Sequence, residues 1–287
     1  MGFAEGDSKA EGDRAMSMDM QQQCSKLSVV VPVFNEVHNI RANLELLLSE
    51  VEPYFSSYEI LVVSDGSTDG TNQVLNEWQH PRIRPIIFES NRGKGFVVRE
   101  GFRAATGAYI LFIDGGMELH PREIRIFLGL MDLYRADVVV GSKRHPQSKV
   151  DYPALRRILS FMFQMFVKRL FDLDVTDTQV GLKLFRSEVI TAVLPDLTLD
   201  RYGFDLELLA LARMNGFTQF LEAPIRLDYF SRNSRGPVRE MIHVLRVGFD
   251  VTCDAYRLYR RIRKLRKRPA VPASPATSDS KPRRLTT

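Results

Sequence analysis

Acidic side chains follow three predicted strands, at the point where each strand ends. Glu36 follows the first strand, and Asp65 and Asp69 follow the second. Asp114 follows a later one. Because the carboxyl ends of parallel strands meet at one edge of a sheet, we expect the carboxylates of Asp65, Asp69 and Asp114 to converge. Such a group can hydrogen-bond a nucleotide or hold Mg²⁺ or Mn²⁺. The alternative is that these residues are ordinary turn and cap residues, and their joint occurrence favours a binding site.

Apolar runs rich in β-branched residues alternate with helical patterns through the first half of the chain. The expected strands are residues 27–34, 59–63, 84–88, 108–113 and 136–140. The expected helices are Asn39–Glu52, Thr71–Trp78, Gly95–Ala105 and Pro121–Tyr134. This alternation predicts βαβ units, and therefore an α/β fold with a parallel sheet.

The composition is typical of a soluble globular protein. The chain has 287 residues, of which 44% are hydrophobic and 26% charged, with a net charge of +5. It shows neither a secretory signal at its start nor the roughly 18 consecutive apolar residues that a membrane span needs. Cys24 and Cys253 form no metal-binding or disulfide pattern. We expect a cytoplasmic protein in a reducing compartment, with no nucleic-acid partner.

Changes in composition divide the chain into four parts. We expect a disordered leader over residues 1–26 and a large α/β domain over 27–230. A basic amphipathic helical segment is expected over 231–268. The remainder, 269–287, is rich in Pro, Ser, Ala and basic residues, which predicts a disordered tail.

Five motifs in a fixed order resemble the inverting glycosyltransferases of the GT-A fold, family 2. The motifs are Val31–Glu36, Val63–Thr71, Asn91–Gly95, Asp177–Phe185 and Phe204–Leu209. Together they resemble the polyprenyl-phosphate branch, which comprises the dolichyl-phosphate mannosyl- and glucosyltransferases and their bacterial relatives. The resemblance covers about residues 27–230. It implies a GT-A, Rossmann-like sheet flanked by helices, followed here by C-terminal amphipathic helices.

The resemblance also implies roles for individual residues. Those that would line the nucleotide-sugar site are Pro32, Phe34, Glu36, Asp65, Lys94, Gly95 and Asp114. Those that would carry catalysis are Asp114, Lys143, Arg144, Asp177 and Gln179. Among them, Lys143 and Arg144 would hold the phosphate of the acceptor, because cations pair with phosphate oxygens. The alternative for these two residues is a solvated basic loop.

The chain departs from the family motifs at two positions. Ser64 stands where the family usually has a first acid before Asp65. Gly116 stands where the metal motif has its middle carboxylate, between Asp114 and Glu118. We expect Asp114 and Glu118 to be the metal ligands, with Glu118 as a replacement for the missing acid.

Two segments have the composition of helices that meet a lipid surface. Arg156–Phe171 is apolar around most of its circumference and basic at both ends. Val238–Arg268 carries ten Lys or Arg residues against three acids. We expect both to lie near an anionic membrane surface, which makes the protein a peripheral membrane protein. The alternatives are a core helix and an ordinary charged terminal helix.

The expected function is transfer of a hexose from UDP-glucose or GDP-mannose to a polyprenyl phosphate. One alternative is a non-catalytic relative that binds nucleotide or lipid, which is suggested by Gly116. Another is a glycosyltransferase with a sugar or protein acceptor. A dinucleotide-dependent oxidoreductase is disfavoured, because no Gly-X-Gly-X-X-Gly follows the first strand.

Overall fold

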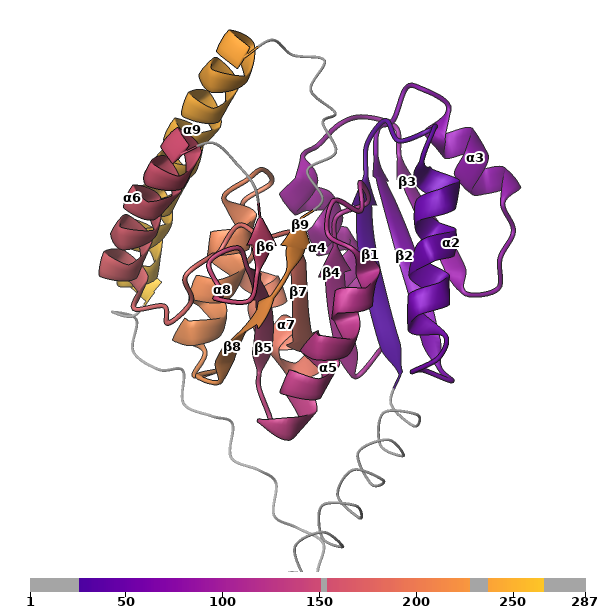
Figure 1. Ribbon diagram of the computed structural model, residues 1–287, viewed down its shortest axis with the longest axis horizontal. Coiled ribbons are helices and arrows are strands. Elements are labelled where there is room, and N and C mark those ends of the chain that lie inside the picture. Colours follow the sequence, from indigo (N-terminus) through magenta and orange to yellow (C-terminus); the bar gives the residue numbers. More distant parts are fainter. Residues whose placement is uncertain (1–25, 151–153, 228–236, 266–287) are drawn as a thin grey trace, which may run out of the picture.

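A seven-stranded sheet forms the centre of the computed structural model, which describes residues 26–150, 154–227 and 237–265 (Figure 1). The strand order is β3-β2-β1-β4-β7-β5-β8. The strands are β1 (Leu27–Val33), β2 (Tyr58–Asp65), β3 (Ile83–Phe88), β4 (Tyr109–Ile113), β5 (Val138–Ser142), β7 (Leu182–Arg186) and β8 (Phe220–Pro224). A separate two-stranded sheet pairs β6 (Lys149–Val150) with β9 (Arg226–Leu227).

One strand of the large sheet, β7, runs against all its neighbours. It is antiparallel to both β4 and β5, whereas the other neighbouring strands are parallel. Ile113, at the end of β4, pairs with Leu182 at the start of β7. The loop that precedes β7 therefore lies at the same edge as the carboxyl ends of the parallel strands.

Helices cover both faces of the sheet. On one face, residues of α2 (Ile40–Val51), α3 (Thr71–Glu77) and α5 (Ile124–Leu133) join one hydrophobic core. On the other face, the second core takes in α4 (Lys94–Ala104), α7 (Ser187–Val193) and α8 (Phe204–Met214). Two 3₁₀ turns, Pro121–Glu123 and Leu194–Asp196, complete the connections.

Alternation along the strands assigns side chains to the two cores. In β1, Val29 and Val31 belong to the first core, whereas Val30 belongs to the second, and all three side chains are fully buried. Successive side chains of a strand point to opposite faces, so a strand covered on both sides is apolar throughout. This explains the continuous apolar runs of the sequence.

Two long helices, α6 (Ala154–Phe171) and α9 (Pro237–Leu265), lie side by side at the end of the molecule near β8 (Figure 1). The rings of Phe171 and Tyr259 meet edge to face, with centroids 6.3 Å apart. The buried face of α9 consists of Val251, Ala255, Leu258 and Ile262. Within the described residues, no helix is both long enough and apolar enough to cross a membrane.

The predicted α/β fold is confirmed, with all five predicted strands and all six predicted helical segments present in the described residues. The segment predicted as one helix from Pro121 begins instead with a 3₁₀ turn, and α5 starts at Ile124. The strands β6 to β9 were not predicted. Residues 1–25, the boundary near 230 and the tail from 269 lie outside the described residues.

We predict that the same substitution has opposite effects at two helical glycines. A Cβ on Gly101 of α4 would overlap Val30 and contact Val63, whereas nothing lies within 4 Å of a Cβ on Gly129 of α5. Gly101→Ala should therefore lower the free energy of unfolding by about 1–3 kcal/mol through overpacking. Gly129→Ala should raise it by up to ~1 kcal/mol, because Ala favours helix. Urea unfolding measures both, and equal effects would contradict the close packing of α4 on the sheet.

Candidate active site

The loops after β1 and β2 are joined by hydrogen bonds to the side chains of Asn35 and Asp69. The side-chain oxygen of Asn35 accepts from the N–H of Thr68 at 2.8 Å. The Asp69 carboxylate accepts from the N–H of Val37 at 3.0 Å and from the backbone and hydroxyl of Thr71. Burial would raise the pKa of Asp69, but these hydrogen bonds outweigh burial and lower the pKa below its ordinary value. Part of this acidic motif therefore acts as a structural clamp.

The residues predicted to line the nucleotide pocket on β1 lie beside this clamp. Pro32 is buried, whereas the ring of Phe34 is 46% exposed immediately after the strand ends. Glu36 is half-buried, and its N–H donates to the hydroxyl of Thr71 at 2.8 Å. Phe34 thus presents an open aromatic surface at the sheet edge, and its contact with a nucleotide stays a prediction.

Asp65 holds the loop that contains Asn91–Gly95. Its carboxylate is nearly fully buried and accepts from the N–H of Arg92 at 2.7 Å and of Gly93 at 3.0 Å. Ser64, which replaces an acid of the motif, is fully buried, and its hydroxyl bonds Asn72 at 2.6 Å. Contact of Asp65 with a base stays a prediction, and its observed partners are backbone groups of the next loop.

Lys94, the first residue of α4, reaches the carboxylate that follows β4. Its ammonium lies 2.6 Å from Oδ1 of Asp114. Burial would lower the pKa of Lys94, but the charges of Asp114 and Asp205 raise it above its ordinary value. The backbone of the same turn is fixed, because the N–H of Gly95 donates to the carbonyl of Asp200 at 2.8 Å. Lys94 and Asp114, which were each predicted for the nucleotide-sugar site, are thus in direct contact.

The loop after β4 places Asp114 against the start of β7. The N–H of Asp114 donates to the carbonyl of Gly181 at 3.0 Å, and any side chain at position 181 would overlap the Asp114 carboxylate. Glu118 is exposed, and within the described residues no group of three or more His, Cys, Asp or Glu side chains is arranged to hold a metal ion. The ligand role of Glu118 stays a prediction.

A buried ion pair that the sequence did not predict lies under this contact. The ammonium of Lys183 on β7 binds the carboxylate of Asp205 on α8 and the carbonyl of Val180. Burial lowers the pKa of Lys183 and raises the pKa of Asp205, because it disfavours both charged forms. One sign of this ion pair is present in the sequence, namely a single lysine, Lys183, inside the otherwise apolar segment Val180–Phe185.

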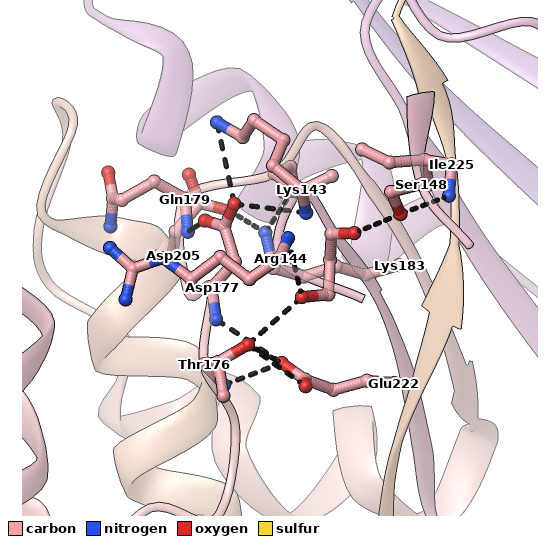
Figure 2. A network of polar contacts seen from close by, with 12 residues as sticks. Lys143, Arg144, Ser148, Thr176, Asp177, Gln179, Lys183, Asp205, Glu222 and Ile225 are labelled. Carbon is pink, nitrogen blue, oxygen red and sulfur yellow. Dashed lines mark hydrogen bonds and ion pairs between the residues drawn. The ribbon is translucent and has the colours of Figure 1, made fainter. Parts of the chain in front are cut away.

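The residues predicted for the acceptor phosphate gather around Asp177 (Figure 2). The ammonium of Lys143 lies 3.5 Å from the Asp177 carboxylate, which also accepts from the N–H of Gln179 at 3.2 Å. The guanidinium of Arg144 stacks over the ring of Phe161 on α6, 5.6 Å from its centroid. Lys143, Asp177 and Gln179 therefore form one cluster, and Arg144 connects it to α6.

A second carboxylate supports this cluster from β8. Glu222 accepts from the N–H and hydroxyl of Thr176 and, at 3.3 Å, from the N–H of Asp177 (Figure 2). Two polar atoms of the same loop, the hydroxyl of Thr178 and Nε2 of Gln179, are buried without a hydrogen-bond partner. Since buried polar atoms are normally paired, these two are candidates to bind a ligand. Thr178 was not among the predicted site residues.

Loop 177–181 connects the two clusters. It carries Asp177 and Gln179 at one end and touches Asp114 through Gly181 at the other. The predicted donor and acceptor residues therefore lie at one edge of the sheet, outside the carboxyl ends of the parallel strands, where α/β proteins bind ligands.

Comparison with known proteins gives consistent results. The family model described as glycosyl transferase family 2 matches residues 28–194. The dolichyl-phosphate beta-glucosyltransferase of Homo sapiens is 33% identical over 217 residues, which cover 70% of this chain and 65% of that protein. The enzyme of the same name from Saccharomyces cerevisiae is 34% identical over 207 residues, covering 65% of this chain and 62% of that protein. The matched region thus spans less than two thirds of these relatives.

Solved structures support the fold. Glucosyl-3-phosphoglycerate synthase from Mycobacterium tuberculosis, in complex with Mn²⁺, uridine diphosphate and phosphoglyceric acid, superimposes with a TM-score of 0.63 at 17% identity. The superposition covers 85% of this chain and 82% of that one. The predicted GT-A fold is therefore confirmed. Together with the family match over residues 28–194, this shows that the chain belongs to glycosyl transferase family 2.

Proposed function

We propose that this chain transfers glucose from a nucleoside diphosphate glucose to a polyprenyl phosphate of the dolichyl type. The proposal rests on the contact between Asp114 and Gly181. There the Lys94–Asp114 pair meets the loop that holds Asp177 and Gln179. The similarity to dolichyl-phosphate beta-glucosyltransferases supports glucose and a lipid phosphate as substrates.

The reaction is an inverting displacement. A phosphate oxygen of the acceptor attacks the anomeric carbon from the face opposite the leaving diphosphate. Since this oxygen is already anionic at neutral pH, the protein does not need a strong general base. Its contribution is to position the two substrates and to stabilise charge. Lys143 and Arg144 hold the acceptor phosphate, Gln179 donates its unpaired Nε2 to the sugar or acceptor, and Lys94 lies ready for the diphosphate.

Asp114 fits a divalent cation if the donor supplies further ligands. Mg²⁺ in proteins is often held by one or two carboxylates together with substrate phosphates and water. The Asp114 side chain is 38% exposed, and the absence of a side chain at Gly181 leaves room for its carboxylate beside the start of β7. Asp114 would hold the ion, with Glu118 as the second candidate. When bound, the ion supplies positive charge that offsets the charge on the leaving diphosphate.

Exposed apolar and basic residues of α6 and α9 suit a lipid surface. The exposed apolar side chains are Phe161, Met162, Met165, Phe249 and Tyr256. Exposed basic residues on the same helices include Lys168, Arg169, Arg246, Arg257, Arg260, Arg263 and Lys264. Anionic lipid attracts each basic residue near its surface by about 1 kcal/mol. We infer that these two helices face an anionic membrane and bring the Arg144 side of the site toward the lipid acceptor.

We predict that the wild-type protein transfers glucose from UDP-glucose to a short polyprenyl phosphate more efficiently than mannose from GDP-mannose.

Asp114→Asn should lower the rate of this transfer by about 10²-fold or more, because charge stabilisation at a reacting group has this magnitude. Glu45→Gln is the matched control, since Glu45 is an exposed acid on α2. Radiolabelled sugar in the lipid phase measures both rates. Nucleotide binding without any transfer would instead favour the non-catalytic alternative.

Removal of divalent metal should abolish transfer, and Mg²⁺ or Mn²⁺ should restore it. If Glu118 is a ligand, Glu118→Ala should raise the metal concentration for half-maximal activity roughly tenfold, as the loss of a supporting metal contact does. Glu45→Ala provides the control for loss of an acid elsewhere. Titration of activity with metal for wild type, Glu118→Ala and Glu45→Ala tests whether Glu118 is a ligand. An unchanged titration for Glu118→Ala would exclude Glu118 from the metal site.

Replacing exposed apolar residues of α6 should weaken membrane binding. The triple variant Phe161→Gln, Met162→Gln and Met165→Gln should lower binding to anionic vesicles at least tenfold, because each apolar side chain contributes roughly 1.5–3 kcal/mol when buried. Leu133→Gln with Tyr134→Gln is the control, since these side chains of the α5 end are equally exposed. Vesicle co-sedimentation measures binding, and equal loss in both variants would contradict a specific lipid-facing surface.

A further inference from the structure

Lys94 is held in place by its surroundings rather than by Asp114 alone. The N–H groups of Gly95 and Phe96 both donate to the carbonyl of Asp200, which fixes the first turn of α4. The ammonium lies 5.2 Å from the centroid of the Phe112 ring and 5.9 Å from that of Phe204. Aromatic faces attract a cation at these distances. The position of the ammonium beside Asp114 is therefore built into the fold.

The second acid of this region, Asp205, has its own direct partner and acts on Lys94 only through its charge. Asp205 is buried and bound by the equally buried ammonium of Lys183. Asp114 is thus the carboxylate that pairs directly with Lys94, at 2.6 Å. The four residues form two ion pairs whose charges sum to zero, and the Asp114 carboxylate already has its counter-ion.

A free divalent ion meets an unfavourable site here. It would have to displace the Lys94 ammonium from Asp114, and Gly116 contributes no second carboxylate. A nucleoside diphosphate changes this balance in two ways. Its phosphate oxygens offer another anionic partner for Lys94, and they also supply the oxygen ligands that a hard cation requires.

We propose that Lys94 is a built-in counter-ion of Asp114, so that a divalent ion binds strongly only together with a nucleoside diphosphate. The inference rests on the proposed function, because it assigns the diphosphate to this site. Donor and metal then enter as one unit, and the diphosphate draws Lys94 away from Asp114 as it arrives. Lys94 has two partners in succession, first a carboxylate and then a phosphate.

Mn²⁺ binding in the absence of a sugar acceptor tests this inference. Free Mn²⁺ is measured by electron paramagnetic resonance for the wild-type chain, with and without UDP. Wild type should bind Mn²⁺ at least tenfold more tightly when UDP is present. Lys94→Met should bind Mn²⁺ alone about tenfold more tightly than wild type, which corresponds to loss of ~1.4 kcal/mol of competition. It should also gain less from UDP.

Two further variants separate the ion pair from general charge effects. Lys94→Arg keeps a cation beside Asp114 and should bind Mn²⁺ alone as weakly as wild type. Lys26→Met removes a lysine that lies just before β1, at the opposite edge of the sheet, and pairs with Glu59. This variant should leave Mn²⁺ binding within about twofold, because screening weakens distant charges. Thermal unfolding confirms that each variant is folded. Mn²⁺ binding by Lys94→Met that equals wild type would overturn the inference.

The two proposals fail in different ways. Tighter Mn²⁺ binding by Lys94→Met in a protein that transfers no sugar would support the ion-pair role and contradict the transferase proposal. Sugar transfer by a wild-type protein that binds Mn²⁺ equally well with and without UDP would leave the transferase proposal standing. That same result would overturn the counter-ion role of Lys94.

Discussion

The buried ion pair between Lys183 and Asp205 is the interaction on which the geometry of the site depends. It joins β7 to the first turn of α8, and the Lys183 ammonium also binds the carbonyl of Val180. Removing one partner of a buried pair leaves an uncompensated charge and typically costs 3–5 kcal/mol, so the two elements are fixed relative to each other. Because Val180 precedes Gly181, the same ammonium holds the backbone that touches Asp114.

The antiparallel direction of β7 determines which loop the Lys183–Asp205 pair holds beside Asp114. A parallel strand would deliver the segment before it to the opposite edge of the sheet, away from Asp114. In the observed direction, loop 177–181 arrives at the ligand-binding edge with Asp177 and Gln179. A second buried carboxylate, Glu207 of α8, extends the arrangement to α9, since it accepts from Arg261 at 2.6 Å and from the N–H of Leu199 at 2.8 Å. Helix α9, one of the two proposed to meet lipid, is thus anchored to the loop that holds the start of α4.

Periodicity in the sequence predicted the strands and helices of the first half because each is long, apolar and regularly spaced. The family resemblance assigned Lys94 and Asp114 to one site, and the structure brings the two side chains into contact, while their roles stay predictions. The sequence did not predict β7, because a five-residue strand interrupted by Lys183 has no clear pattern and carries no signal of direction. It likewise could not show that Lys94 pairs with Asp114, since pairing depends on where α4 packs.

The two departures from the family motifs differ in their physical consequences. At position 64 the lost acid is replaced by a hydroxyl that is fully buried and bonded to Asn72, so the local network remains complete. At position 116 glycine brings no polar group, and Asp114 is left with Lys94 as its charged partner. Loss of a carboxylate from a metal site weakens binding of the free ion more than binding of an ion that arrives with phosphate ligands, because the phosphates replace part of what is missing. Under the proposed donor-dependent binding, a metal site without the second acid still holds an ion that offsets the charge of the diphosphate, because the donor supplies part of the ligands.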